Sequence, residues 1–425
     1  MTNETLTARD KTVVWHPYTQ MKRWPEAIGI TGGKDAVLMA EDGTEYIDAI
    51  SSWWVTLHGH AHPHIAAAVS RQAGTLEHCI FAGFTHEPAV TLAERLVHIL
   101  PGNMGKIFYS DNGSTAVEVA LKMAWQYWQN KGNSKTKILS LEGAYHGDTV
   151  GAMSVSARSS FTDAFKPWLF DVCFLPFPAP GHETACLEAL EQQLKKGDVA
   201  AIILEPLIQG SAGMYMYTPE TLEAMVQLCH RYDALVIADE VMTGFGRTGR
   251  LFAFDHIAAV PDMICLSKGL TGGTMPLGVT ACTNDIFDAF YSDDLHKTLY
   301  HGHSFTANPL ACAAANASLD LLLDDSCTRA IAHIAARHEA MQQQWTGHPK
   351  IKEVRRCGTI IALELNTGET HYHNGLRDFI YRFFIDRKLL MRPLGNIIYI
   401  LPPYCITDEQ LDIIYTNINA LLEHI

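Results

Sequence analysis

The sequence predicts an α/β protein built around a mainly parallel sheet. Three short apolar runs, at residues 200–204, 235–238 and 263–266, have the length and composition of buried strands. Residues 221–233 lie between the first two runs and repeat apolar side chains on one helical face. A strand, a helix and another strand in this order indicate a right-handed crossover between parallel strands.

The rest of the chain extends this pattern. Further strands are expected at 106–109, 138–141, 278–282, 360–365 and 396–401, and helices at 65–76, 116–125, 183–196, 309–323 and 411–422. Residues 37–48 predict a hairpin around the turn sequence Asp42-Gly43, and the polar residues 1–12 predict a loose or helical segment. We expect an N-terminal segment (1–55) that packs with a small C-terminal domain (322–425), and a large domain (56–321) between them.

Composition excludes several classes of protein. The 425 residues carry a formal net charge of −14, whereas a nucleic-acid-binding surface needs clustered positive charge. No apolar run reaches the roughly 18 residues of a membrane span, and the N-terminus lacks the apolar core of a secretory signal. The 10 cysteines are scattered through apolar runs without a C-x-x-C pair, which is typical of reduced core residues. We therefore expect a cytoplasmic protein without nucleic-acid or membrane partners.

Two chemically complementary residues follow two of the predicted strands. Asp239 ends the run at 235–238, and Lys268 comes shortly after the run at 263–266. Ligands of parallel sheets bind beyond the carboxyl ends of the strands, so one site can hold both side chains. Pyridoxal phosphate (PLP) needs such a pair, because an amine bonds its aldehyde and an acid keeps its pyridine nitrogen protonated.

Two alternatives explain the same pair. A structural acid at a strand end and an unrelated surface lysine would leave the same pattern in the sequence. A Mg²⁺-binding acid of a P-loop enzyme is the other alternative, but the required G-x-x-x-x-G-K-[ST] motif is absent.

Three further motifs fit a planar, phosphorylated ligand. Residues 112–115 (Asn-Gly-Ser-Thr) open a predicted helix, whose first N–H groups can bind an anion, although a plain helix cap has the same sequence. Tyr145 follows a strand and lies between small residues, where it can stack on a ring or fill the core. Trp53 and Trp54 cannot both face one core on a strand, so we expect at least one at a pocket or interface.

A histidine-rich segment raises the possibility of a metal site. Four histidines fall between residues 58 and 64. Glycine and proline in this segment favour a turn before the helix at 65–76, and no cysteine or acid stands at metal-ligand spacing. We expect no bound metal.

Taken together, the motifs resemble the class III (ω-type) aminotransferases of fold type I over nearly the whole chain. The matching residues, in family order, are Gly113-Ser114-x-Ala116-x-Glu118, Tyr145-His146-Gly147, Glu205-Pro206, the segment 239–249, Ser267-Lys268-Gly269 and Asn308-Pro309. The resemblance implies a PLP-dependent transaminase with a large domain, whose mostly parallel sheet has seven strands, and a small α+β domain.

Four other motifs resemble one branch of this family. They are Trp15-His16-Pro17-Tyr18, Ser51-Ser52-Trp53-Trp54, His58-Gly59-x-x-His62-Pro63 and Met391-Arg392-Pro393-x-Gly395. That branch aminates 8-amino-7-oxononanoate to 7,8-diaminononanoate in biotin biosynthesis, with S-adenosyl-L-methionine as amino donor. Lysine as donor, and a different class III activity on acetylornithine, γ-aminobutyrate or β-alanine, are the alternatives.

The resemblance also implies roles for the cofactor-binding residues. Lys268 would hold the cofactor covalently and move the proton, and Asp239 would pair with the pyridine nitrogen. Tyr145 would stack on the ring. The phosphate would be bound by Gly113, Ser114 and a hydroxyl from the partner subunit of a homodimer, where Ser304 stands in place of the usual threonine. His303 departs from the proline that the family pattern has before this hydroxyl.

The remaining roles concern the substrate. Tyr18, Trp53 and Trp54 would line the pocket, with Gly302 of the partner subunit nearby, and Arg392 would bind the substrate carboxylate. Asp148 and Arg247 would organise the pocket floor. A non-catalytic protein that kept the fold is a further alternative, but it would be expected to lose the lysine, and Lys268 is present.

Overall fold

The computed structural model describes residues 4–23, 27–367 and 375–425. At its centre lies a seven-stranded sheet in the order β4-β12-β11-β10-β7-β5-β6. These strands are β4 (Met104–Ser110), β5 (Lys137–Leu141), β6 (Cys173–Leu175), β7 (Val199–Leu204), β10 (Leu235–Asp239), β11 (Met263–Leu266) and β12 (Gly278–Thr283). Only β12 runs antiparallel to its neighbours in this sheet, so the predicted mostly parallel arrangement is confirmed.

Both faces of the sheet are buried. In β10, Leu235 and Ile237 pack into one core cluster together with apolar residues of α5 (Gly113–Asn130). Val236 and Ala238 point the other way, into a cluster with residues of α7 (Glu183–Leu194) and α8 (Pro219–Arg231). Because successive strand residues face opposite sides, burial on both faces requires an apolar residue at every position.

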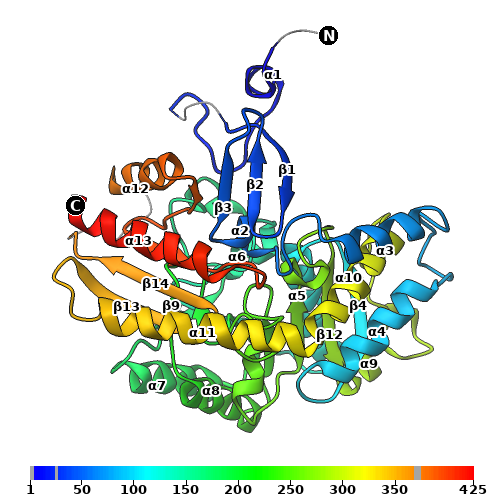
Figure 1. Cartoon of the computed structure of the whole chain (residues 1–425). Helices are drawn as coiled ribbons and strands as arrows, with labels where there is room; N and C mark the ends of the chain where they lie inside the picture. The colour runs from blue at the N-terminus through cyan, green and yellow to red at the C-terminus, as the bar shows by residue number, and fades with distance from the viewer. Residues whose placement is uncertain (1–3, 24–26, 368–374) are drawn as a thin grey trace.

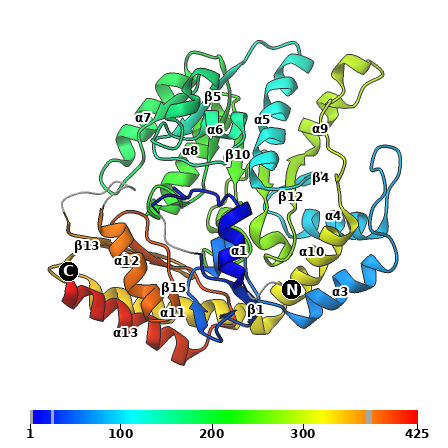
Figure 2. The same ribbon diagram turned by 90° about the horizontal axis from the view of Figure 1, so that it is seen from above.

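A second group of elements is formed mainly by the C-terminal part of the chain. Strands β13 (Ile351–Cys357), β14 (Ile360–Leu365) and β16 (Ile397–Ile400) form an antiparallel sheet in that order. Helices α11 (Asp325–Trp345), α12 (Gly375–Asp386) and α13 (Asp408–His424) lie around this sheet (Figure 1). Seen from above, α12 and α13 lie at the lower left of the molecule, α7 and α8 at the upper left, and α1 (Leu6–Val13) near the centre (Figure 2).

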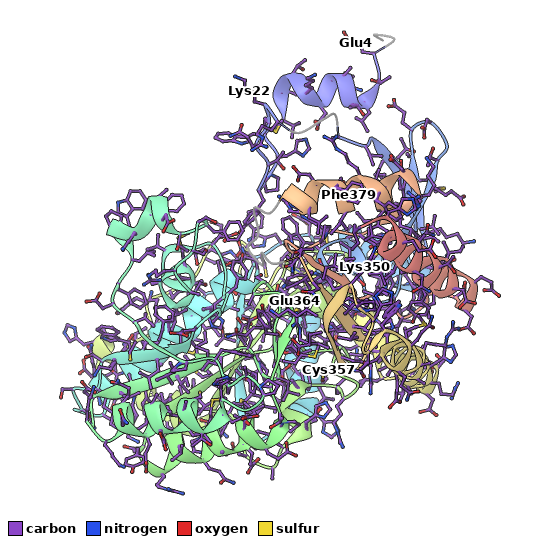
Figure 3. The ribbon with its side chains drawn as sticks, turned by 90° about the vertical axis from the view of Figure 1, so that its left-hand side faces the viewer. Glu4, Lys22, Lys350, Cys357, Glu364 and Phe379 are labelled. Carbon is purple, nitrogen blue, oxygen red and sulfur yellow. The ribbon has the colours of Figure 1, made fainter. Side chains whose placement is uncertain are left out.

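The N-terminal part joins this C-terminal group through a mixed sheet. The hairpin of β2 (Val37–Ala40) and β3 (Glu45–Asp48) confirms the prediction for residues 37–48, and β1 (Ile30–Lys34) pairs with β2. Strand β15 (Leu389–Leu390) pairs with β3 in parallel, with Leu390 opposite Asp48. Glu4 and Lys22 mark the outermost part of this region, beyond Phe379 of α12 (Figure 3). The domain boundaries near residues 55 and 321 stay a prediction.

Shorter elements complete the structure. They are α2 (Ser51–Trp54), α3 (Pro63–Ala73), α4 (Glu87–Ile99), α6 (Val150–Val155), α9 (Asn284–Phe290), α10 (Pro309–Leu322), the pair β8 (Ile208–Gln209) and β9 (Tyr215–Met216), and the 3-10 turns η1 (Asp163–Trp168), η2 (Ala253–His256), η3 (Lys268–Thr271) and η4 (Leu295–Lys297). Within the described residues, no helix combines the length and apolar character needed to cross a membrane.

Candidate active site

A cavity of about 420 Å³ lies beyond the carboxyl ends of β10 and β11. Asp239 is the last residue of β10, and Lys268 begins the 3-10 turn η3 shortly after β11. Both side chains line the cavity, as the strand-end argument predicts. The same cavity is lined by Gly113, Ser114 and Tyr145, which come from two other strand-to-helix connections.

Lys268 occupies an unusual backbone and electrostatic environment. Its φ is +45°, a left-handed conformation that non-glycine residues adopt at a free-energy cost and that is common at functional sites. Its Nζ lies 4.7 Å from the ring centroid of Trp54. Burial lowers the pKa of Lys268 to about 8, although the nearby carboxylates of Asp239 and Glu205 oppose this shift. Lys268 is therefore a neutral amine at a lower pH than a surface lysine, and only the neutral amine is a nucleophile.

Asp239 is held in place by two neighbours. His146 Nδ1 lies 2.6 Å from Asp239 Oδ2, and the backbone N–H of Val241 donates to Oδ1 at 3.1 Å. A carboxylate oxygen accepts hydrogen bonds, so Nδ1 is the donor in this contact. Sequence reasoning did not predict this contact, although His146 stands next to Tyr145 in the Tyr-His-Gly motif.

Glu205 connects two loops next to the cavity through hydrogen bonds. Its Oε1 accepts a hydrogen bond from the backbone N–H of Tyr145 at 3.0 Å, and its Oε2 accepts one from the N–H of Gly210 at 2.9 Å. Burial raises the pKa of Glu205 to about 7, while His146 and these backbone bonds act in the opposite direction. Glu205 thereby fixes the backbone that carries Tyr145.

The start of α5 lines the edge of the cavity and has the features that favour an anion. Asn112 caps the helix by accepting the Thr115 N–H at 3.0 Å, and the first turn contains no acidic residue. A Cβ on Gly113 would come within 2.7 Å of Val241, so only glycine keeps this approach open. The first N–H groups of a helix have no intrahelical acceptors and favour anions, so Gly113 and Ser114 fit a phosphate.

These features together fit PLP. The cavity offers a nucleophilic amine, a buried carboxylate, an aromatic ring and a phosphate-binding helix start, all lining one space. Each corresponds to one part of the PLP molecule: its aldehyde, its pyridine nitrogen, its ring face and its phosphate.

A tyrosine from the N-terminal segment reaches the same region. Tyr18 Oη donates a hydrogen bond to Asp148 Oδ2 at 2.5 Å and lies 3.3 Å from Tyr145 Oη. Its ring packs edge-on against Trp53 with centroids 5.6 Å apart. The structure therefore brings Tyr18, Asp148 and Tyr145 together across 130 residues of sequence.

The two adjacent tryptophans face different cavities. Trp54 lines the cavity that contains Lys268, and its Nε1 donates to Tyr399 Oη at 2.9 Å. Trp53 lines a second cavity of about 330 Å³ together with Arg392, whose guanidinium carbon lies 4.7 Å from the Trp53 ring centroid. The two tryptophans thus stand between the lysine and the arginine, one facing each.

Among the predicted residues, Gly302, Ser304 and Arg247 line neither the Lys268 cavity nor the Arg392 cavity. Gly302 and Ser304 are exposed in the loop before α10. Arg247 is buried and donates to the carbonyl oxygens of Pro402 at 2.7 Å and Thr56 at 3.4 Å. Arg247 therefore connects the segment after the tryptophans to the segment after β16.

The side chains of three histidines in the histidine-rich segment contact three different partners. His58 Nε2 lies 3.1 Å from Ser318 Oγ, His60 pairs with Asp48, and His64 pairs with Asp320. Among the residues that the structure describes, no group of three or more His, Cys, Asp or Glu side chains is arranged to hold a metal ion.

This fold and this cavity are those of an aminotransferase, and the chain belongs to the class III aminotransferase family, whose model matches residues 19–422. It is 49% identical to the adenosylmethionine-8-amino-7-oxononanoate aminotransferase of Synechococcus elongatus, over 97% of this chain and 99% of the relative. The enzyme of the same name from Geobacter sulfurreducens is 39% identical over 96% of this chain and 95% of its own.

Solved structures show the same similarity. The adenosylmethionine-8-amino-7-oxononanoate aminotransferase of Methanocaldococcus jannaschii superposes with a TM-score of 0.92 at 36% identity, covering 98% of each chain. A PLP-bound amine transaminase from an uncultivated Pseudomonas species superposes with a TM-score of 0.90 at 30% identity, covering 97% of this chain and 98% of its own.

Proposed function

We propose that the protein transfers an amino group from S-adenosyl-L-methionine to 8-amino-7-oxononanoate, with PLP as cofactor, in biotin biosynthesis. The observation that carries the proposal is that the adjacent residues Trp54 and Trp53 contact Lys268 and Arg392, respectively, each at 4.7 Å and each in its own cavity. This arrangement suits a substrate with a reactive ketone near one end of an aliphatic chain and a carboxylate at the other. The names of the Synechococcus elongatus and Methanocaldococcus jannaschii relatives support the same assignment.

Each part of the Lys268 cavity has a task in this reaction. Bound PLP supplies the aldehyde that carries the amino group and the protonated ring that takes up electrons. Lys268 would hold the cofactor between turnovers, and its Nζ would move the proton between the donor carbon and the acceptor carbon. The Asp239 carboxylate would keep the proton on the pyridine nitrogen, because a nearby negative charge favours the protonated form. Tyr145 would cover one face of the ring, and the start of α5 would bind the phosphate.

The Arg392 cavity would recognise the far end of the substrate. A guanidinium group can bind a carboxylate through two parallel hydrogen bonds, and stacking on Trp53 fixes its plane. The flat faces of Trp53 and Trp54 offer apolar walls to the aliphatic chain with little loss of side-chain entropy. The pairing of these walls with Arg392 favours this substrate over the shorter ones of other class III aminotransferases.

The identity of the amino donor is the second part of the proposal. A cavity of about 720 Å³ shares Tyr145 and Gly147 with the Lys268 cavity and adds Phe161 and Tyr215 to its walls. This space favours a bulky donor such as S-adenosyl-L-methionine over lysine. Lysine remains the alternative donor, and both amines are included in the test below.

We further infer a cytoplasmic homodimer with shared active sites. Ser304 and the neighbouring Phe305 are exposed, in the loop from which the partner subunit would contribute a hydroxyl to the phosphate. Two-fold symmetric dimers are the commonest closed assemblies, and such a dimer would place this loop at each active site.

An absorbance experiment with each half of the reaction tests the proposal. Protein loaded with PLP is mixed with S-adenosyl-L-methionine, lysine, ornithine, γ-aminobutyrate or β-alanine, and the loss of the visible absorbance band of lysine-bound PLP is followed. We expect S-adenosyl-L-methionine to remove the band and 8-amino-7-oxononanoate to restore it. If lysine alone removed the band, lysine would replace S-adenosyl-L-methionine as the proposed amino donor. If only another keto acid restored the band, the assignment of 8-amino-7-oxononanoate as the substrate would be rejected.

A further inference from the structure

The segment that carries both tryptophans has a strained backbone. Ser51, Ser52 and Trp54 have φ values of +53°, +59° and +67°, so three of the four residues in α2 are left-handed. None of them is glycine, and a run of left-handed non-glycine residues persists only where surrounding contacts enforce it. The contacts that enforce this conformation therefore decide where Trp53 and Trp54 point.

Asp48 supplies three of these contacts, and the Ser51 hydroxyl supplies another by donating to the Leu401 carbonyl oxygen at 2.8 Å. The Asp48 side chain is fully buried at the end of β3. Oδ1 accepts the backbone N–H of Ile50 at 3.2 Å, and Oδ2 accepts the N–H of Ser52 at 2.7 Å and the Ser52 hydroxyl at 3.3 Å. One carboxylate thus binds two backbone donors on either side of Ser51.

His60 completes the arrangement. Its Nε2 lies 2.9 Å from Asp48 Oδ2, and it comes from the histidine-rich segment that carries no metal site in the described residues. With Nε2 as donor, the imidazole fixes the carboxylate in the rotamer that reaches Ser52. The pair is mostly buried, with side-chain exposure of 14% for His60 and 0% for Asp48, so its hydrogen bonds are poorly replaced by water.

Asp48 also lies where the two sides of the substrate site meet. Its register partner is Leu390 of β15, two residues before Arg392 in the sequence. The segment that it holds places Trp54 against Lys268 and Trp53 against Arg392, each at 4.7 Å. A shift of this segment would move both tryptophans relative to the amine and the guanidinium group, and so change the space open to the substrate between them.

We propose that Asp48, oriented by His60, is a positioning residue that holds Trp53 and Trp54 between Lys268 and Arg392 and so sets the length of keto acid that the site accepts. This inference rests on the proposed function, because the length of the substrate is defined by its ketone and its carboxylate. Asp48 itself lines neither the Lys268 cavity nor the Arg392 cavity. It acts through the backbone of Ser52.

Asp48→Asn is the most direct variant. The amide keeps the size of the side chain. Its NH2 group, however, replaces an accepting oxygen and then faces a group that is itself a hydrogen-bond donor. Leaving a buried backbone N–H unpaired should raise the KM for 8-amino-7-oxononanoate about tenfold, while kcat changes by less than about threefold. The dissociation constant of the keto acid, measured by calorimetry without amino donor, should rise in parallel. The variant should also discriminate less between the keto acid and a homologue one methylene shorter.

His60→Gln should give a smaller change of the same kind, because the backbone bonds to Asp48 remain. The matched control is His333→Gln, which removes an exposed imidazole that lies 2.8 Å from Asp408 Oδ1. This control should leave KM, the dissociation constant and length discrimination unchanged. If Asp48→Asn does not fold, His60→Gln decides the question by the same measurements.

Two results separate this inference from the proposed function. If the wild-type protein neither binds nor aminates the keto acid, the proposed function fails and the inference falls with it. If the wild-type protein does aminate it, but Asp48→Asn only lowers the melting temperature, the inference alone is overturned. Unchanged KM and length discrimination in folded, PLP-loaded Asp48→Asn would show that Asp48 has a structural role only.

Discussion

His146 Nδ1 lies 2.6 Å from Asp239 Oδ2, and both side chains are buried beside Lys268. The imidazole donates to one oxygen of the carboxylate and so fixes the orientation of Asp239 at the wall of the cavity. The backbone N–H of Val241 holds the second oxygen at 3.1 Å. The carboxylate therefore cannot rotate away without breaking two hydrogen bonds.

Replacing Asp239 with asparagine should preserve PLP binding and slow turnover. A neutral amide does not stabilise a protonated pyridine nitrogen, and losing such an electrostatic contribution lowers kcat on the order of 10²-fold. Steady-state kinetics of PLP-loaded protein provide the measurement, with bound PLP quantified after denaturation. A kcat near that of wild type would remove Asp239 from this role.

Lys268→Ala should fold normally and lose the covalent bond to PLP. Lys268 is the buried lysine of the cavity, and alanine has no amine that can replace it. The visible spectrum is recorded before and after borohydride, and the protein is then digested to locate any reduced adduct. A reducible adduct at another lysine would show that Lys268 is not the attachment site.

The reaction of the cofactor-free protein with PLP should accelerate as the pH rises through about 8. Burial lowers the pKa of Lys268 to that value, so the amine is mainly protonated below it and mainly neutral above it. Stopped-flow absorbance at a series of pH values measures the rate of covalent attachment. A rate that rises only near the pKa of an ordinary lysine, 10.5, would contradict the effect of burial.

A mixture of two inactive variants should recover activity if the protein is a homodimer with shared sites. In a hybrid of Ser304→Ala and Lys268→Ala subunits, one site would carry both substitutions and the other neither. Subunits are mixed under conditions that permit exchange, and hybrid formation is verified with differently tagged chains. Proven hybrids that are no more active than the parent proteins would argue against a shared site.

The apolar core was predictable because burial on both faces of a sheet leaves a continuous apolar run in each strand. The direction of a strand, by contrast, produces no pattern in the sequence. Residues 278–282 were predicted as a strand without a direction, and β12 is antiparallel to β11 and β4. The direction of β12 depends on the connection that leads to it from η3. The residues of η3 were used to predict the active site and not the path of the chain.

In the site, too, some residues could be predicted from the sequence and others could not. Asp239 and Lys268 were predictable because each stands at the end of an apolar run, where parallel sheets bind ligands. Asp48 and His60 were not, because their pairing depends on how a hairpin and a turn meet in space. The left-handed conformations of Ser51 and Ser52 also leave no sequence signal, since serine has no general preference for them.

Kinetics of Arg392→Ala on two compounds test the central claim most directly. The compounds are 8-amino-7-oxononanoate and an analogue that lacks its carboxylate. If Arg392 binds the carboxylate, its removal leaves that group unpaired, which weakens binding by about 2–5 kcal/mol. We predict that the variant raises KM for the keto acid far more than it lowers kcat, leaves PLP binding unchanged, and handles the analogue like wild type. An equal loss on both compounds would show that Arg392 does not bind the carboxylate and would contradict the proposed substrate.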